Sequence, residues 1–274
     1  MIKIIVLILS LGLSLLTTLT NNNLNTVQIV FLTIGLFLAY IVGFIVLFFF
    51  FAFMFSFYVN EKKKPTKYCR AQRSIYNVFV RICLSLFGVK LTKKGLDKVP
   101  KGAVVIMSNH VSNVDPLVMN IVHRDKDLIF ASKKSLFKVP CFGKMIHKIG
   151  YLKFDRIDSM KDMGEMKRGV KWVKDGISLC LYPEGTRNKS DDYLLEFKAP
   201  AMKFATLTNS PLVVSAIYGT KEVNDKLLLK RHKVDYEVLD VIYPEDYKNM
   251  DNDELTKVVY EKIEKWIKEK SENV

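Results

Sequence analysis

A histidine and a carboxylate lie five residues apart in Asn109-His110-Val111-Ser112-Asn113-Val114-Asp115. Histidine is the side chain most easily poised as a base near neutral pH. An aspartate beside it can hold its tautomer and stabilise the imidazolium that forms when it takes up a proton. Residues at this spacing do not share a helix face, so a turn must bring the two side chains together. The pair predicts general-base chemistry, with His110 as the base and Asp115 as its orienting partner.

The same residues also have an ordinary structural interpretation. Asp115 is followed by Pro116, which is typical of a helix N-cap with proline at the first helical position. His110 is then a loop residue. Both interpretations stay open until the rest of the chain is considered.

A second group of polar residues suits anion binding. It is the stretch Tyr182-Pro183-Glu184-Gly185-Thr186-Arg187. Proline stops a strand ladder and glycine permits backbone conformations that other residues resist. Such a turn can direct backbone N–H groups, the Thr186 hydroxyl and the Arg187 guanidinium at one phosphate. The alternative is a Glu184–Arg187 ion pair that closes an ordinary turn.

Two more cations are candidates for contact with an anionic ligand. Arg156 comes just after the predicted strand Tyr151–Phe154, and Lys134 lies in the basic and apolar stretch Lys133–Pro140. Each is also compatible with a plain surface position. Their assignment depends on whether the fold brings them near the other two groups.

Other chemistries lack their residues. The chain has no GxxxxGK[ST], GxSxG, HExxH or GxGxxG pattern. Its cysteines form no CxxC pair and have no zinc-like spacing with histidine, so we expect buried, reduced thiols facing a cytosol. Direct transfer assisted by a histidine base is the simplest chemistry left. The cysteines are Cys69, Cys83, Cys141 and Cys180, and the expectation of burial rests on the apolar surroundings of the last three.

Strand and helix patterns alternate from Thr92 onward. This alternation predicts an α/β sandwich built on a mostly parallel sheet. The His110 group then lies between a strand and a helix, where connections often carry function. Predicted strands are Ala103–Ser108, Leu128–Ala131, Tyr151–Phe154, Ser178–Tyr182, Leu212–Ile217 and Val234–Val241; predicted helices are Pro116–His123, Phe142–Lys148, Met160–Lys174, Pro200–Thr208 and Asp253–Lys270.

The N-terminal part differs sharply in composition. Lys3 is the only charged side chain before Glu61, so nearly all of the net charge of +14 lies in the remainder. Two apolar runs, Ile4–Thr20 and Val27–Val59, predict a membrane-associated helical hairpin that spans the bilayer or dips into one leaflet. The longer run must tilt, break near Gly43 or lie partly in the interface.

The basic residues after the hairpin indicate its orientation. They begin with Lys62, Lys63 and Lys64, and such clusters are typical of the cytoplasmic side of a membrane. Residues 74–91 have helical spacing, which suits either a membrane surface or packing on a core. We divide the chain into a hairpin (1–60), a basic junction with an amphipathic helix (61–91) and a globular domain (92–274). A basic chain with an apolar anchor favours an anionic membrane as partner over nucleic acid.

Together these groups resemble the lysophosphatidic acid acyltransferases, also called 1-acylglycerol-3-phosphate acyltransferases. Blocks typical of that family appear in its order. Departures at Ser135, Pro200 and Val214 bear on acceptor preference and loop shape. The matching blocks are Asn109-His110-x4-Asp115, Lys134-Ser135-Leu136 with Val139–Gly143, Gly150–Arg156, Glu184-Gly185-Thr186-Arg187 and Pro211–Ile217.

The resemblance implies an enzyme of phospholipid biosynthesis. It implies that His110, oriented by Asp115, deprotonates the sn-2 hydroxyl of lysophosphatidic acid, which attacks the thioester of acyl-CoA or acyl-carrier protein. It assigns the acceptor phosphate to Arg156, Glu184, Gly185, Thr186 and Arg187, with Lys134 as a possible further contact. No metal or other cofactor is implied. We expect the enzyme at the cell membrane, with its catalytic domain on the cytoplasmic face. Alternatives are an acyltransferase acting on glycerol-3-phosphate or another lysophospholipid, and a non-catalytic membrane protein that binds anionic lipid.

Overall fold

The computed structural model describes residues 2–20, 24–57, 59, 63, 65–155, 163–190, 192–225 and 231–272. It divides the chain into two compact units, Met1–Asn60 and Glu61–Val274. We describe each unit by itself.

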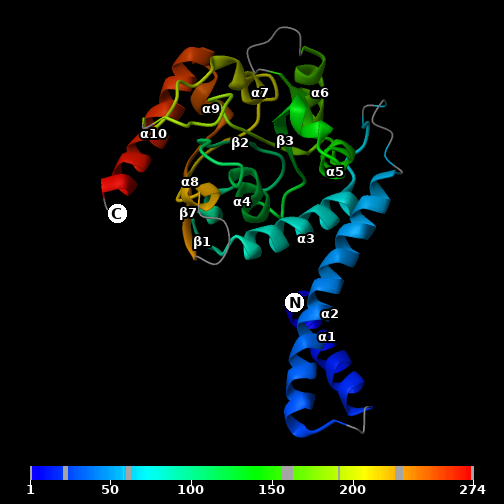
Figure 1. Ribbon diagram of the computed structural model, residues 1–274. Helices are drawn as coiled ribbons and strands as arrows, with labels where there is room; N and C mark the ends of the chain where they lie inside the picture. The colour runs from blue at the N-terminus through cyan, green and yellow to red at the C-terminus, as the bar shows by residue number, and fades with distance from the viewer. Residues whose placement is uncertain are drawn as a thin grey trace. The chain divides into compact units, whose positions relative to one another are not determined.

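The first unit is an antiparallel pair of helices, α1 (Ile2–Leu19) and α2 (Thr26–Phe57) (Figure 1). Small polar residues spaced four apart, Ser10, Ser14 and Thr18, are buried between them. The Thr33 hydroxyl donates to the Thr18 hydroxyl across the pair at 3.2 Å. Small residues let apolar helices approach closely where lipid gives no hydrophobic driving force. This row of small polar residues therefore explains why α1 and α2 pack closely against each other.

Helix α2 runs unbroken through Gly43, so the break near Gly43 is excluded from the three alternatives for the longer apolar run. Its segment Thr26–Leu47 is long and apolar enough to cross a membrane, judged by length and composition. The apolar part of α1, Ile5–Leu19, is shorter.

The second unit is built on a seven-stranded sheet with the order β1-β7-β6-β2-β5-β3-β4. All neighbouring strands are parallel except β6 and β7. The expectation of a mostly parallel α/β sheet is confirmed. The strands are β1 (Val89–Lys94), β2 (Val105–Met107), β3 (Leu128–Lys133), β4 (Leu152–Phe154), β5 (Ser178–Leu181), β6 (Leu212–Tyr218) and β7 (His232–Ile242).

Helices cover both faces of this sheet. Helix α3 contacts α4 and α5, whereas α6 contacts α7, and α10 lies against β6. Right-handed crossovers explain the division, because α4 and α5 connect strands in one direction along the sheet and α6 and α7 connect them in the other. The helices are α3 (Arg70–Leu86), α4 (Asp115–Val122), α5 (Phe142–Ile149), α6 (Met163–Lys174), α7 (Lys203–Thr206), α8 (Lys221–Asp225), α9 (Pro244–Tyr247) and α10 (Asn252–Glu272), with short 3₁₀ turns η1 (Leu96–Lys98), η2 (Lys134–Lys138) and η4 (Ala199–Ala201).

The structure corrects the sequence-based prediction around residue 90. The predicted helix over 74–91 ends at Leu86, and the unpredicted strand β1 begins at Val89. Gly88 lies between them with φ of +63°, a left-handed conformation that commonly ends helices. Helix α3 buries Tyr76, Val80 and Leu84, so this face packs on the core.

The centre of the sheet contains a change in winding direction. After β2 the chain crosses through α4 toward β3, and after β5 it crosses through α7 in the opposite sense toward β6. Strands β2 and β5 are neighbours, with Met107 paired with Leu181 at their carboxyl ends. Ligands of open α/β sheets bind in the crevice at such a switch point. Both chemically interesting loops follow these two strands.

Candidate active site

The loop between β2 and α4 brings His110 and Asp115 together. Asp115 is fully buried, and its Oδ2 lies 2.8 Å from Nδ1 of His110. The same oxygen accepts the backbone N–H groups of Val111 at 2.7 Å and Ser112 at 2.8 Å. A carboxylate that accepts these donors holds the hydrogen on Nδ1 of His110 and leaves Nε2 as the basic nitrogen. The predicted turn and contact are present.

The N-cap interpretation of Asp115 is wrong. Helix α4 begins at Asp115 itself, after Val114, which gives no side-chain cap. The carboxylate accepts N–H groups that precede it in the chain, whereas a cap accepts N–H groups that follow it. Capping and orientation of His110 therefore do not compete for this carboxylate.

A threonine that the sequence motifs do not contain completes the environment of Asp115. The buried hydroxyl of Thr220 donates to Oδ1 of Asp115. Gly219, which precedes it after β6, has φ of +84°, and a Cβ there would lie 2.2 Å from the carbonyl oxygen of Lys233. Glycine is required for this turn. The sequence signal that could have identified Thr220 was its position just after the predicted strand Leu212–Ile217.

Asn109 joins the loop between β2 and α4 to the neighbouring strand β6. Its side-chain amide donates to the carbonyl of Ile217 at 2.9 Å and accepts the N–H of the same residue at 2.9 Å. Asn109 is buried, and its paired bonds extend the connection between β2 and β6 beyond the end of the ladder. His110 therefore begins from a fixed backbone position.

The turn after β5 is linked to His110 through the backbone. The Glu184 carboxylate is buried and accepts the N–H of His110 at 2.6 Å and that of Leu195 at 3.2 Å. In return, the N–H of Asn188 donates to the carbonyl of His110 at 2.7 Å. Glu184 thus holds two loops together. Glu184 and Arg187 are both described, and they form no ion pair with each other, so the alternative interpretation of this turn is wrong.

The predicted phosphate-binding residues of this turn face outward. Gly185 has φ of +68°, which confirms that the turn uses glycine's conformational freedom. Gly185 and Thr186 are exposed and Arg187 is half-buried. Within the described part of the chain, no hydrogen bond or ion pair occupies the Arg187 guanidinium. The site roles of these residues, including Glu184, stay predictions.

Of the other two predicted cations, only Lys134 lies in the described part of the chain. It follows the carboxyl end of a strand, as the Glu184–Arg187 turn does. Lys134 follows β3 and forms a 2.7 Å ion pair with Asp155, which follows β4, and both side chains are substantially exposed. Strands β5, β3 and β4 are neighbours. Arg156 lies outside the described residues. The thiols are all free, but only Cys180 is buried, so burial was wrong for Cys83 and Cys141.

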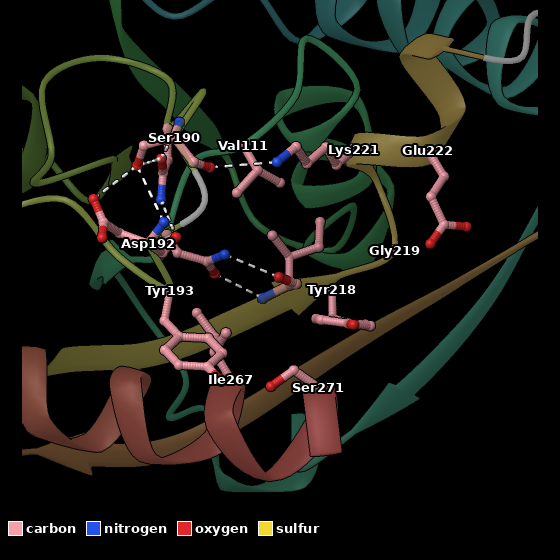
Figure 2. Close-up of a pocket in the computed structure, with 13 residues that line it drawn as sticks. Val111, Ser190, Asp192, Tyr193, Tyr218, Gly219, Lys221, Glu222, Ile267 and Ser271 are labelled. Carbon is pink, nitrogen blue, oxygen red and sulfur yellow. Dashed lines mark hydrogen bonds between the residues drawn. The ribbon is translucent and has the colours of Figure 1, made fainter. Parts of the chain in front are cut away.

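A cavity of about 260 Å³ lies beside the loop between β2 and α4 (Figure 2). Asn109 and Val111, which flank His110, contribute to its wall, together with the ends of β6 and α10. Lys221 points across it and donates to the carbonyl of Ser190 at 3.3 Å. His110 itself is not among the residues that line this cavity. Across the described residues, no three His, Cys, Asp or Glu side chains gather as a metal site would require.

Burial raises the pKa of Glu184 to about 7, although the two N–H groups that it accepts favour its charged form. An acid whose pKa is higher in the folded protein stabilises the fold below its unfolded pKa, and this contribution is lost as pH rises through the folded value. For Glu184 the window runs from pH 4.5 to about 7.

We expect Glu184→Gln to remove this pH dependence. As pH rises from 4.5 to about 7, the free energy of unfolding of the wild type should fall by roughly 3 kcal/mol relative to that of the variant. The melting temperature of the wild type should fall accordingly. Thermal unfolding in detergent at a series of pH values measures the difference. Glu196→Gln is the control, because that side chain is exposed and should show no such trend. A constant difference between wild type and Glu184→Gln would contradict the assignment.

Comparison with known proteins agrees with this geometry. The model of the family described as Acyltransferase matches residues 90–218. Over these residues the chain is similar to the acyltransferase family. This stretch contains the His110–Asp115 loop and the Glu184–Arg187 turn, so both elements of the candidate site lie within the part of the chain that matches the family model.

Individual relatives carry a more specific name. The chain is 26% identical over 192 residues to the 1-acyl-sn-glycerol-3-phosphate acyltransferase of Borreliella burgdorferi, covering 68% of this chain and 75% of that protein. It is 29% identical over 173 residues to the protein of the same name from Escherichia coli, covering 62% and 68%. The resemblance to this family is thus confirmed.

A solved structure shares the fold. The crystal structure of the 1-acyl-sn-glycerophosphate (LPA) acyltransferase PlsC from Thermotoga maritima superposes with a TM-score of 0.62 at 20% identity. The match covers 81% of this chain and 87% of that chain. This likeness shows that the acyltransferase domain has the same α/β architecture.

Proposed function

We propose that this chain transfers a fatty acyl group from a thioester to the sn-2 hydroxyl of lysophosphatidic acid, which gives phosphatidic acid. One observation carries the proposal: Asp115 holds Nδ1 of His110 at 2.8 Å, which leaves Nε2 free for a substrate at the switch point of the sheet. The names of the relatives from Borreliella burgdorferi and Escherichia coli support this acceptor.

The residues act in a short sequence of steps. Nε2 of His110 takes the proton from the acceptor hydroxyl as its oxygen attacks the thioester carbonyl carbon. The resulting imidazolium is stabilised by Asp115. The tetrahedral intermediate collapses, the carbon–sulfur bond breaks, and the thiolate leaves with the proton from His110. The products are phosphatidic acid and a free thiol, either CoA or the phosphopantetheine of a carrier protein.

The acceptor phosphate belongs, in this proposal, on the turn after β5. Arg187 supplies a guanidinium that no described residue engages, and Thr186 and Gly185 lie exposed beside it. Lys134 is proposed as a further contact, and so is Arg156 on its match to the family motif alone. Holding the phosphate there converts an encounter into a positioned reaction. Glu184 contributes by holding the turn against His110.

Arg187→Gln should raise the KM for lysophosphatidic acid. Loss of charge-assisted hydrogen bonds to a phosphate costs about 1.5–3 kcal/mol, which corresponds to roughly 10- to 100-fold. Initial rates of thiol release at varied lysophosphatidic acid concentrations give the KM. Lys189→Gln is the control, because it removes a nearby exposed cation and should leave the KM unchanged. An unchanged KM in Arg187→Gln would remove Arg187 from the phosphate site.

We also propose attachment to a phospholipid membrane, with the catalytic domain at the cytoplasmic face. The apolar segment Thr26–Leu47 supports attachment, and the basic residues that follow the hairpin in the sequence support the orientation. Lysophosphatidic acid resides in membranes, so an anchored domain meets its acceptor at the bilayer surface.

The decisive experiment is thioester turnover by the full chain in mixed micelles. Acyl-CoA and acyl-carrier protein are each offered with lysophosphatidic acid, glycerol-3-phosphate or a lysophospholipid with a larger headgroup. We expect thiol release coupled to phosphatidic acid formation. Preference for another acceptor would support the alternative acyltransferase assignments. Vesicle binding without thiol release from any combination would support a lipid-binding protein. Protease protection in sealed right-side-out vesicles tests the orientation.

A further inference from the structure

Tyr182 lies flat against the imidazole of His110. The two ring centroids are 4.2 Å apart and the ring planes differ by 15°. Building on the proposed function, we propose that Tyr182 is a positioning residue that fixes the plane of the His110 ring for proton transfer. The sequence places Tyr182 at the start of the stretch Tyr182–Arg187, but assigns the tyrosine itself no role in catalysis or phosphate binding.

The other contacts of His110 leave a need for this constraint. Asp115 holds the ring at one atom, Nδ1. Glu184 and Asn188 hold only the backbone. With this hydrogen bond alone, the His110 ring could still rotate about the line from Nδ1 of His110 to Oδ2 of Asp115. A second ring stacked on one face removes that freedom, because tilting would drive the two rings into each other.

Tyr182 is itself held firmly. It follows β5 directly and is 7% exposed. Pro183 comes next, and a residue before proline is restricted to extended backbone conformations. The ring of Tyr182 therefore forms a fixed wall against which the more exposed His110 ring rests.

The ring face of Tyr182, and not its hydroxyl, acts on His110. The hydroxyl is buried and has no hydrogen-bond partner within the described residues. Burial raises the pKa of Tyr182 well above its usual value, so the phenol stays neutral. A neutral aromatic face attracts a cation placed over it within about 6 Å. The stack thus favours the imidazolium that forms when His110 takes the proton.

The same core offers a matched control. Tyr151 is also buried, at 3% exposure. Its ring contacts Tyr76 and Phe130. Replacing either tyrosine with leucine removes the same atoms from the core, but only the change at residue 182 removes a ring from His110.

The experiment compares Tyr182→Leu, Tyr182→Phe and Tyr151→Leu in the full chain. We expect Tyr182→Leu to lower kcat by about 100-fold, the scale of a misplaced catalytic group, with little change in KM. Tyr182→Phe keeps the ring face and should retain kcat near the wild-type value. Tyr151→Leu should lower the melting temperature as much as Tyr182→Leu does, while its kcat stays close to that of the wild type.

A spectroscopic readout separates positioning from the proposed reaction. The Nδ1 hydrogen shared by His110 and Asp115 should give a low-field proton NMR signal in the wild type and in Tyr182→Phe. It should broaden or vanish in Tyr182→Leu, whatever the substrate proves to be. Equal kcat and an intact signal in Tyr182→Leu would overturn the proposal. Failure of phenylalanine to restore kcat would also overturn it, because the hydroxyl would then be the active part.

Discussion

Replacing His110 with alanine should reduce thiol release in the presence of lysophosphatidic acid by roughly 10²- to 10⁴-fold, the usual contribution of a general base. Among the described residues, His110 is the one imidazole that Asp115 orients. No second base in the described structure contacts Nε2 of His110 and could replace it. Steady-state kinetics at saturating donor and acceptor measure the loss. Because Arg187 and the turn around it stay in place, the KM for the acceptor should change little.

His123→Ala is the matched control for this variant. His123 is buried, its Nε2 lies 2.7 Å from the hydroxyl of Tyr236, and burial lowers its pKa to about 4. Its removal should reduce stability and leave kcat intact. A His110→Ala protein that binds vesicles normally but releases no thiol excludes the non-catalytic lipid-binding alternative. Full activity in His110→Ala would instead show that the base has been misassigned.

Asp115→Asn should damage both activity and folding. The buried carboxylate accepts His110, two backbone N–H groups and the hydroxyl of Thr220. An asparagine turns an NH₂ group toward one of these donors, so at least one buried donor is left unpaired. Breaking such a buried network costs about 3–5 kcal/mol, and loss of the tautomer control costs about 10⁴-fold in kcat in a comparable His–Asp pair.

Two measurements on Asp115→Asn separate the effects. Chemical unfolding in detergent gives the change in stability, and kcat below the melting transition gives the change in activity. Thr220→Val is the control, since it removes a single donor to Oδ1 and leaves the Nδ1 contact of His110 in place. It should cost about 1 kcal/mol of stability and keep most of the activity. If Asp115→Asn behaves like Thr220→Val, the carboxylate does not orient the base.

Local pattern predicted much of the fold. The helices expected over Phe142–Lys148 and Asp253–Lys270 agree with α5 and α10 to within a few residues. The central strands were found because buried parallel strands are short apolar runs with clear boundaries. Strand β1 was missed, because Val89 and Leu91 are its only apolar residues and three of its six residues are lysines, so this edge strand lacks such a run.

The site was predictable only in part. His110 and Asp115 are close in sequence, so their spacing and residue types suggested the contact. Glu184 is 74 residues from His110, and Thr220 is 105 residues from Asp115. Such contacts depend on the order in which β2, β5 and β6 assemble, which no local pattern contains. The inward direction of Glu184 and the ring of Tyr182 against His110 follow from that assembly.

The reciprocal backbone link between Glu184, His110 and Asn188 has a kinetic consequence. Two hydrogen bonds therefore join the Glu184–Arg187 turn, which is proposed to bind the acceptor phosphate, to the β2–α4 loop that carries His110, so the two segments should move together. Free energy gained at the phosphate can therefore appear as turnover rate as well as affinity, since distant binding interactions can support the chemical step. An acceptor without a phosphate would lose both. Selection against neutral glycerides would then be exerted largely after binding, through a base that such acceptors leave poorly aligned.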